Sequence, residues 1–138
     1  MRARIGCTAV ALALLCAGSV SAQPVSYQVE GDGITQSLTG KPGNAARGKA
    51  LIAQRDAANC LKCHSISDRQ LAGGGTKGPS LDGIGAALTP AQIRLSVVEL
   101  GRVKRGAEMP SFHKRGGEAP RLSAEQVEDV VAYLASLR

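Results

Sequence analysis

The sequence predicts a small all-α fold, in which three main helices are separated by long loops. Three observations predict it: three segments have helical periodicity, no two segments look like paired strands, and aromatic residues make up only 2% of the 138 residues. Aromatic side chains usually supply much of the buried area of a small core. So few of them, together with such long loops, indicate that a large, flat apolar ligand fills the centre of the domain.

Residues 1–22 have the three parts of a secretory signal peptide. Two arginines give a positive start, an apolar run follows, and Val20, Ser21 and Ala22 place small residues before a cleavage point. The apolar run is too short to span a bilayer. We therefore expect the mature chain to have no membrane span and to be exported to the periplasm.

Residues 23–43 are rich in Gly, Ser, Thr and Gln, and we expect them to form an extended arm with one short strand at 27–29. The domain itself is expected over residues 44–138. Its first helix should run from residue 45 to about residue 55, because this stretch consists mostly of good helix formers and Asn44 can cap its start.

A glycine-rich loop is expected over residues 65–88, and the second main helix should follow it directly. Thr89 can cap that helix, and Pro90 suits its first position because a proline there loses no hydrogen bond. Gly101 either ends the helix or is tolerated inside it. The helix carries an apolar stripe at helical spacing, formed by Ile93, Val97 and Leu100.

The last helix is the clearest element of the sequence, and it follows a second loop at residues 106–122. Ser123 and Gln126 form a capping box at its start. Gly48 has no side chain, so it should let the first helix cross the last helix closely, where Tyr133 of the last helix can fill the space. One face is apolar, formed by Val127, Val130, Val131 and Leu134. The acids are expected elsewhere, mostly in the first turns, and are Glu125, Glu128 and Asp129.

The segment NCLKCHS contains Cys60, Cys63 and His64. Its two cysteines are the ones that signal-peptide cleavage would leave in the chain. This spacing occurs in dithiol redox sites, zinc sites and haem attachment sites. A dithiol site needs a preceding strand, and structural zinc needs a fourth ligand, for which the chain offers only His113. The adjacency of Cys63 and His64 also makes it awkward for both to hold one tetrahedral ion. Haem explains the spacing, because each thiol adds to one vinyl group and His64 then lies under the iron.

Two further residues are candidates for completing a haem site. Met109 is the only methionine after the start of the chain, and it lies in a polar loop beside Pro110, which favours a thioether as sixth ligand. His113 is the alternative sixth ligand, and otherwise an exposed loop residue near the haem edge. The carbonyl of Pro79, in KGPSLDGIG, could accept the Nδ1 proton of His64 and so fix its ring.

The formal net charge of the chain is +6, which suits docking on acidic protein surfaces. The scarcity of aromatic residues for base stacking argues against nucleic-acid binding. The basic residues that flank the Met109 loop are Arg102, Lys104, Arg105, Lys114 and Arg115.

The chain resembles class I cytochromes c over residues 44–138, in the four motifs CLKCH, GPSLDGIG, EMP and VVAYLASL. It is also similar to the SoxX family of monohaem subunits, in GDGITQSLTGKPGNAARGKAL, MPSF and LSAEQVEDVVAYLASL. The resemblance implies a small helical cytochrome fold, with three main helices and long loops wrapped around one covalently bound haem c.

The same resemblance implies residue roles and partners. Cys60 and Cys63 would carry the thioethers, His64 and Met109 would be axial ligands, and Pro79 would support His64. A SoxX protein pairs with a SoxA cytochrome in an L-cysteine S-thiosulfotransferase, which couples thiosulfate to a cysteine of the carrier SoxYZ. This chain would accept electrons, supply no nucleophile, and pass the electrons to a downstream cytochrome or oxidase. The alternative is a free-standing periplasmic electron shuttle.

Overall fold

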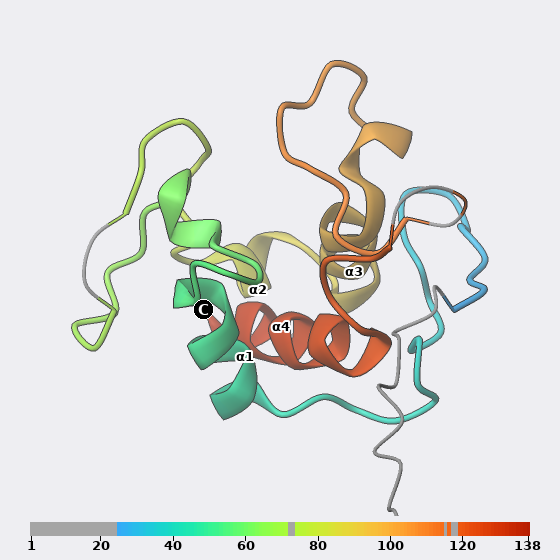
Figure 1. The fold of residues 1–138 in the computed structure, drawn as a ribbon, viewed down its shortest axis with the longest axis horizontal. Helices are drawn as coiled ribbons and strands as arrows, with labels where there is room; N and C mark the ends of the chain where they lie inside the picture. Colours follow the sequence, from blue (N-terminus) through green and yellow to red (C-terminus); the bar gives the residue numbers. More distant parts are fainter. Residues whose placement is uncertain (1–24, 72–73, 115, 117–118) are drawn as a thin grey trace, which may run out of the picture.

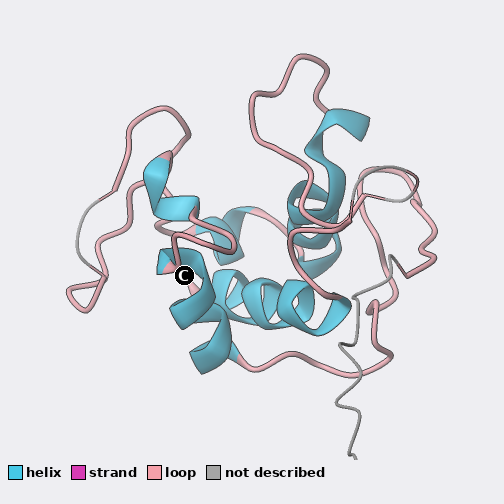
Figure 2. Cartoon of the chain, in the orientation of Figure 1, coloured by secondary structure: helices cyan, strands magenta, loops and turns pink. Residues whose placement is uncertain are grey.

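The computed structural model describes residues 25–71, 74–114, 116 and 119–138, so the predicted signal peptide at 1–22 lies outside the described residues. The described part contains four α-helices and two short 3-10 turns, and it forms no strand (Figure 2). None of its helices is long and apolar enough to cross a bilayer. The prediction of a small all-α fold is therefore confirmed.

The first and last helices begin at the predicted residues. Helix α1 (Ala45–Ala53) starts after Asn44, whose side chain accepts a hydrogen bond from the Arg47 N–H at 3.0 Å. Helix α4 (Ala124–Ser136) starts after Ser123 with both bonds of the predicted capping box. Each cap satisfies N–H groups that have no partner within the helix, which explains why the starts could be predicted from local sequence.

Helix α1 crosses α4 (Figure 1). The two helices approach closely at Gly48, as predicted. A Cβ atom at Gly48 would lie 2.9 Å from Cβ of Tyr133 and would overlap the backbone carbonyl of Asp129. Only glycine therefore allows this approach. The hydroxyl of Tyr133 donates to Asp68 at 3.1 Å, which ties α4 to the chain segment that follows the cysteine motif. Burial and this carboxylate raise the pKa of Tyr133 to about 12.

Helix α3 (Pro90–Glu99) also packs against α4, and it too has a capping box, formed by Thr89 and Gln92. Gly101 lies in the 3-10 turn η2 (Leu100–Arg102), just after the helix. The buried residues of α3 go beyond the predicted stripe, and those with apolar side chains are Ile93, Leu95, Val97 and Val98.

A short helix, α2 (Ile84–Ala87), interrupts the loop predicted over 65–88. Four residues are too short for a periodic pattern, so the sequence does not predict α2. The backbone N–H of Gly85 donates to the carbonyl of Leu137 at 2.8 Å. That bond fixes α2 against the end of α4 and so positions the loop before it.

The predicted strand at 27–29 is wrong. The arm makes one isolated bridge, between Glu30 and Gly33, where it turns back on itself. The described part of the arm then packs on α3 and α4, and it buries Tyr27, Ile34 and Leu38. Two of its backbone groups are bound by helix side chains: the Leu38 N–H donates to Glu128, and the Ile34 carbonyl accepts from Arg94.

The prediction that Glu128 and Asp129 lie away from the core is also wrong, because each residue is only 3% exposed. Glu128 accepts from Arg94 of α3 at 2.8 Å and from the backbone N–H of Leu38 at 2.8 Å. Asp129 accepts from the Arg47 side chain at 2.6 Å. These partners come from distant parts of the chain, so local sequence could not show that they would make burial of the acids possible.

Candidate functional site

The cysteine motif forms one tight turn. The 3-10 turn η1 (Cys60–Lys62) follows Asn59, and the N–H of Cys63 donates to the carbonyl of Cys60 at 3.1 Å. Side chains three residues apart in a 3-10 turn lie on the same side of it. Cys60 and Cys63 are therefore presented together, and His64 follows directly.

The two cysteines of the motif form no disulfide and are partly exposed. Burial raises the pKa of Cys60 to about 11, so this thiol stays protonated at neutral pH. A dithiol redox site needs the opposite effect, because its attacking cysteine must be a thiolate. The described part of the chain also has no strand before the motif. These two observations disfavour the dithiol interpretation.

The imidazole of His64 is held by the carbonyl oxygen of Pro79, which lies 2.7 Å from Nδ1. A carbonyl oxygen can only accept, so Nδ1 carries the proton and Nε2 keeps a free lone pair. A metal-ligating histidine has this arrangement. The contact with Pro79 is the one that the sequence predicts, whereas the role of His64 as an iron ligand stays a prediction.

Gly78 leaves room for the His64 ring. A Cβ atom at Gly78 would lie 2.5 Å from Cε1 of His64 and 2.7 Å from its Nδ1. Such distances are far shorter than van der Waals contact, so any side chain at position 78 would push the ring aside. Gly78 and Pro79 together therefore form the support of the imidazole.

The loop that contains Gly78 is bound along the cysteine motif by three backbone hydrogen bonds of 2.8 to 2.9 Å. They run from the N–H groups of Gly75, Gly78 and Leu81 to the carbonyls of Leu61, Cys63 and Ser65. The ends of the two segments are joined further by Asp82, which accepts from the backbone and the hydroxyl of Ser67 at 2.8 Å each. These bonds lower the pKa of Asp82. Sequence reasoning missed this contribution of Asp82, although an Asp two residues after Ser80 is a common turn signal.

Met109 lies in the loop that follows η2, and its partly buried side chain packs against the core. In Figure 1, this orange loop and the green segment of the cysteine motif rise from the same side of α4. Lys77 and Glu108 form an exposed ion pair at 3.2 Å, and they neighbour Gly78 and Met109 respectively. The loops of His64 and Met109 therefore face each other.

His113 is fully buried, so its interpretation as an exposed residue near the haem edge is wrong. Its Nε2 accepts from the Val25 N–H at 3.0 Å, and its Nδ1 lies 2.7 Å from the carbonyl oxygen of Leu122. Neither nitrogen is left for a metal. His113 is thus a poor candidate for a sixth iron ligand or a fourth zinc ligand. Within the described residues, no three His, Cys, Asp or Glu side chains gather in a way that could hold a metal ion.

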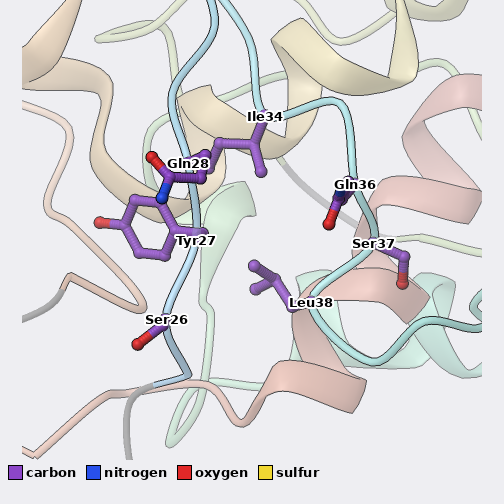
Figure 3. A pocket seen from close by; sticks show the side chains of 7 residues that line it. All are labelled: Ser26, Tyr27, Gln28, Ile34, Gln36, Ser37 and Leu38. Carbon is purple, nitrogen blue, oxygen red and sulfur yellow. The ribbon is translucent and has the colours of Figure 1, made fainter.

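The donor set fits a covalently held haem. One turn offers two thiols, the next residue offers an imidazole with its Nε2 available, and the facing loop offers a thioether. A separate hollow of about 120 Å³ lies along the arm and is lined by residues such as Tyr27 and Leu38 (Figure 3). It is smaller than typical small-molecule sites and contains none of these donors, so it does not compete as a site.

Comparisons with known proteins identify the family of the chain. The family model described as "Cytochrome c" matches residues 45–138. The structure titled "Crystal structure of SoxXA from P. pantotrophus" contains a chain of 35% sequence identity, with a TM-score of 0.71. The match covers 77% of this chain and 90% of that chain. No curated protein sequence matches.

Proposed function

The chain belongs to the cytochrome c family, and on that premise we propose that Cys60 and Cys63 bind its haem while His64 and Met109 ligate the iron. It is a SoxX-type class I cytochrome c, with one covalently bound haem c. It serves as the electron-transfer subunit of a SoxAX complex. Bound haem supplies reversible one-electron transfer, and the residues of the chain attach it, orient it and tune it.

The observation that best supports His64 as the proximal ligand is its 2.7 Å hydrogen bond to Pro79. This bond fixes the tautomer, directs Nε2 away from the loop, and makes the imidazole a stronger donor. Met109 is supported by the position of its loop opposite His64 and by the engagement of both His113 nitrogens. A thioether ligand from Met109 would raise the reduction potential of the haem, which suits an electron acceptor.

The partner of the chain is a SoxA-like cytochrome, in keeping with the SoxXA structure that it resembles. The nucleophilic cysteine of the thiosulfotransferase would belong to that partner, and SoxYZ would be its protein substrate. The electrons would leave through a downstream cytochrome or oxidase. Residues 1–22 would direct the chain to the periplasm, and the arm at 23–43 would precede the cytochrome domain at 44–138.

Replacing Met109 with Ala tests the axial assignment. Ferric haem with a methionine ligand has a weak long-wavelength charge-transfer band, so we expect the wild-type holoprotein to show this band and Met109→Ala to lose it. The reduction potential of the variant should also fall, because the thioether stabilises the ferrous state. Haem content, measured by mass, should be unchanged because both thiols remain. A band that survives in Met109→Ala would overturn the assignment.

Co-expression with a SoxA-like cytochrome tests the partner. We expect the two chains to co-purify, and thiosulfate with SoxYZ to reduce the haem of this chain only when SoxA is present. A chain that remains monomeric and is never reduced under these conditions would instead support the free-standing shuttle. The basic residues Arg102, Lys104 and Arg105 are exposed and could serve docking in either case, whereas Arg115 lies outside the described residues.

A further inference from the structure

His113 joins three segments of the chain that are far apart in sequence. It lies four residues after Met109 and is fully buried, whereas the residues before Met109 in this loop are mostly exposed. Its ring connects the backbone of Val25, in the arm, to the backbone of Leu122, just before α4. Because a backbone N–H can only donate, Nε2 accepts from Val25 and the proton lies on Nδ1.

The backbone around His113 is also fixed, and it forms the base of the Met109 loop. Phe112 donates to the carbonyl of Val97 at 3.2 Å, and His113 donates to that of Val98 at 3.4 Å. Leu122 donates to Phe112 at 3.0 Å. The base of the loop is thus bound to α3 on one side and to the entry of α4 on the other.

A second contact fixes the arm beside this base. Glu99, at the end of α3, accepts from the hydroxyl of Tyr27 at 3.2 Å and pairs with Lys114 at 3.6 Å. The arm therefore reaches the Met109 loop through the Val25–His113 hydrogen bond and through Glu99. The preceding stretch, 101–108, is mostly exposed, and its ion pair between Glu108 and Lys77 is largely exposed to water. Exposed ion pairs contribute little free energy, so the stronger hydrogen-bonded restraint on the backbone of the Met109 loop comes from the side of His113.

We propose that His113 is a positioning residue for Met109, and that through His113 the N-terminal arm sets how firmly the thioether is held at the iron. This inference rests on the proposed axial role of Met109. A buried hydrogen bond is worth roughly a factor of five in an equilibrium. Loss of either bond of His113 should therefore ease displacement of Met109 about fivefold, and loss of both should ease it more than tenfold.

Titration of the ferric holoprotein with imidazole, which competes with Met109 for the iron, measures this displacement. The long-wavelength band reports the bound thioether. His113→Asn keeps an amide N–H near the position of Nδ1 and so keeps the Leu122 bond, whereas His113→Gln keeps an acceptor near Nε2 and so keeps the Val25 bond. We expect about fivefold tighter apparent imidazole binding in each variant, and more than tenfold in His113→Ala.

Two variants of Val25 provide the matched pair. Val25→Pro removes the N–H that His113 accepts and should behave like His113→Asn, whereas Val25→Ala keeps the N–H and should behave like the wild type. Gly48→Ala strains the α1–α4 crossing instead, and it should lower stability without changing imidazole affinity. Urea unfolding measures the unfolding free energy of each variant, so imidazole affinity can be compared with stability.

The possible outcomes separate this inference from the proposed function. If the wild type shows the band and the His113 and Val25→Pro variants bind imidazole as the wild type does, the positioning role is wrong and the ligand assignment survives. If Gly48→Ala tightens imidazole binding as much as His113→Asn does, the effect is general destabilisation, and the positioning role is again wrong. If the wild type lacks the band, Met109 is not the ligand and both proposals fail.

Discussion

Gly78 shows how closely one residue can be specified by the ring next to it. The His64 imidazole occupies the space that a side chain at position 78 would need, and the carbonyl of the following residue, Pro79, binds the ring. A sequence of Gly followed by Pro therefore combines two requirements, namely room for the ring and a fixed acceptor. Neither residue has a side chain that could bind a metal, yet both determine where Nε2 of His64 can lie.

Replacing Gly78 with Ala should displace the His64 ring and weaken its bond to Pro79. We expect the holoprotein to lose roughly 1 to 3 kcal/mol of unfolding free energy, because the added methyl group overpacks a site that has no space for it. The reduction potential should also shift, since the imidazole loses its fixed hydrogen bond. Urea unfolding and redox titration measure the two effects.

Gly101→Ala is the matched control, because a Cβ atom at Gly101 meets nothing within 4 Å. It should leave stability and potential close to those of the wild type. If Gly78→Ala behaved in the same way, the close approach of Gly78 to His64 would not matter in the holoprotein.

At the scale of the elements, a carboxylate joins α1 to α4. Burial alone would raise the pKa of Asp129, but hydrogen bonds from Arg47 and from the Asn44 N–H outweigh it and lower that pKa. The folded state therefore binds the proton of Asp129 more weakly than the unfolded state does. The stabilisation that ionised Asp129 provides is fully present above its unfolded-state pKa of about 3.9. It is lost as the pH falls through the lower pKa of the folded state.

We expect Asp129→Asn to reduce the unfolding free energy at pH 7 by roughly 1 to 2 kcal/mol, since Arg47 is largely exposed to water. The difference in unfolding free energy between the variant and the wild type should narrow as the pH is lowered towards about 3. Urea unfolding at several pH values measures it, with the exposed Asp56→Asn as control. A gap that stays constant over this range would show that ionisation of Asp129 contributes nothing.

The elements differ in how well the sequence predicts them. The starts of α1, α3 and α4 were predicted because a cap and its partner lie within three residues of each other. Helix α2 was not, because it is held by Leu137 rather than by its own pattern. The burial of Glu128 was missed for the same reason, since Arg94 and Leu38 reach it only after folding.

The candidate site shows the same division. Cys60, Cys63 and His64 lie so close in sequence that their spacing predicts a joint role. Pro79 could be predicted as the acceptor for His64 because its carbonyl lies in a rigid turn. The burial of His113 could not be predicted, because both of its partners are backbone groups far away in sequence. Only the apolar Phe112 before it hinted that this basic loop turns inward.

At the scale of the whole molecule, the buried ion pair of Arg94 and Glu128 joins the arm to the helical domain. Arg94 also donates to the carbonyl of Ile34 at 2.6 Å, and Glu128 accepts from Leu38. The pair thus satisfies backbone groups of the arm as well as its own charges. Removing one member leaves a buried charge without its partner.

We expect Arg94→Leu or Glu128→Leu to cost roughly 3 to 5 kcal/mol of unfolding free energy. The double variant should cost less than the sum of the two, because no uncompensated charge remains. It should not recover fully, since Ile34 and Leu38 each lose a hydrogen bond. Urea unfolding of the wild type, the two single variants and the double variant gives the coupling energy between Arg94 and Glu128.

The exposed pair Lys77 and Glu108 is the control, and its removal should cost under about 1 kcal/mol. Equal costs for the two pairs would contradict the role assigned to burial. Full additivity of Arg94→Leu and Glu128→Leu would show that the two side chains do not act together.

The tight turn of the cysteine motif also bears on how the protein matures. All three groups assigned to the attachment side of the haem come from five consecutive residues, 60–64, whereas Pro79 and Met109 come from later in the chain. A newly made, still unfolded polypeptide can thus present both thiols together for attachment of the cofactor. The contacts of Pro79 and of the Met109 loop join segments that are far apart in sequence and need the native fold, so attachment to the two thiols does not depend on them.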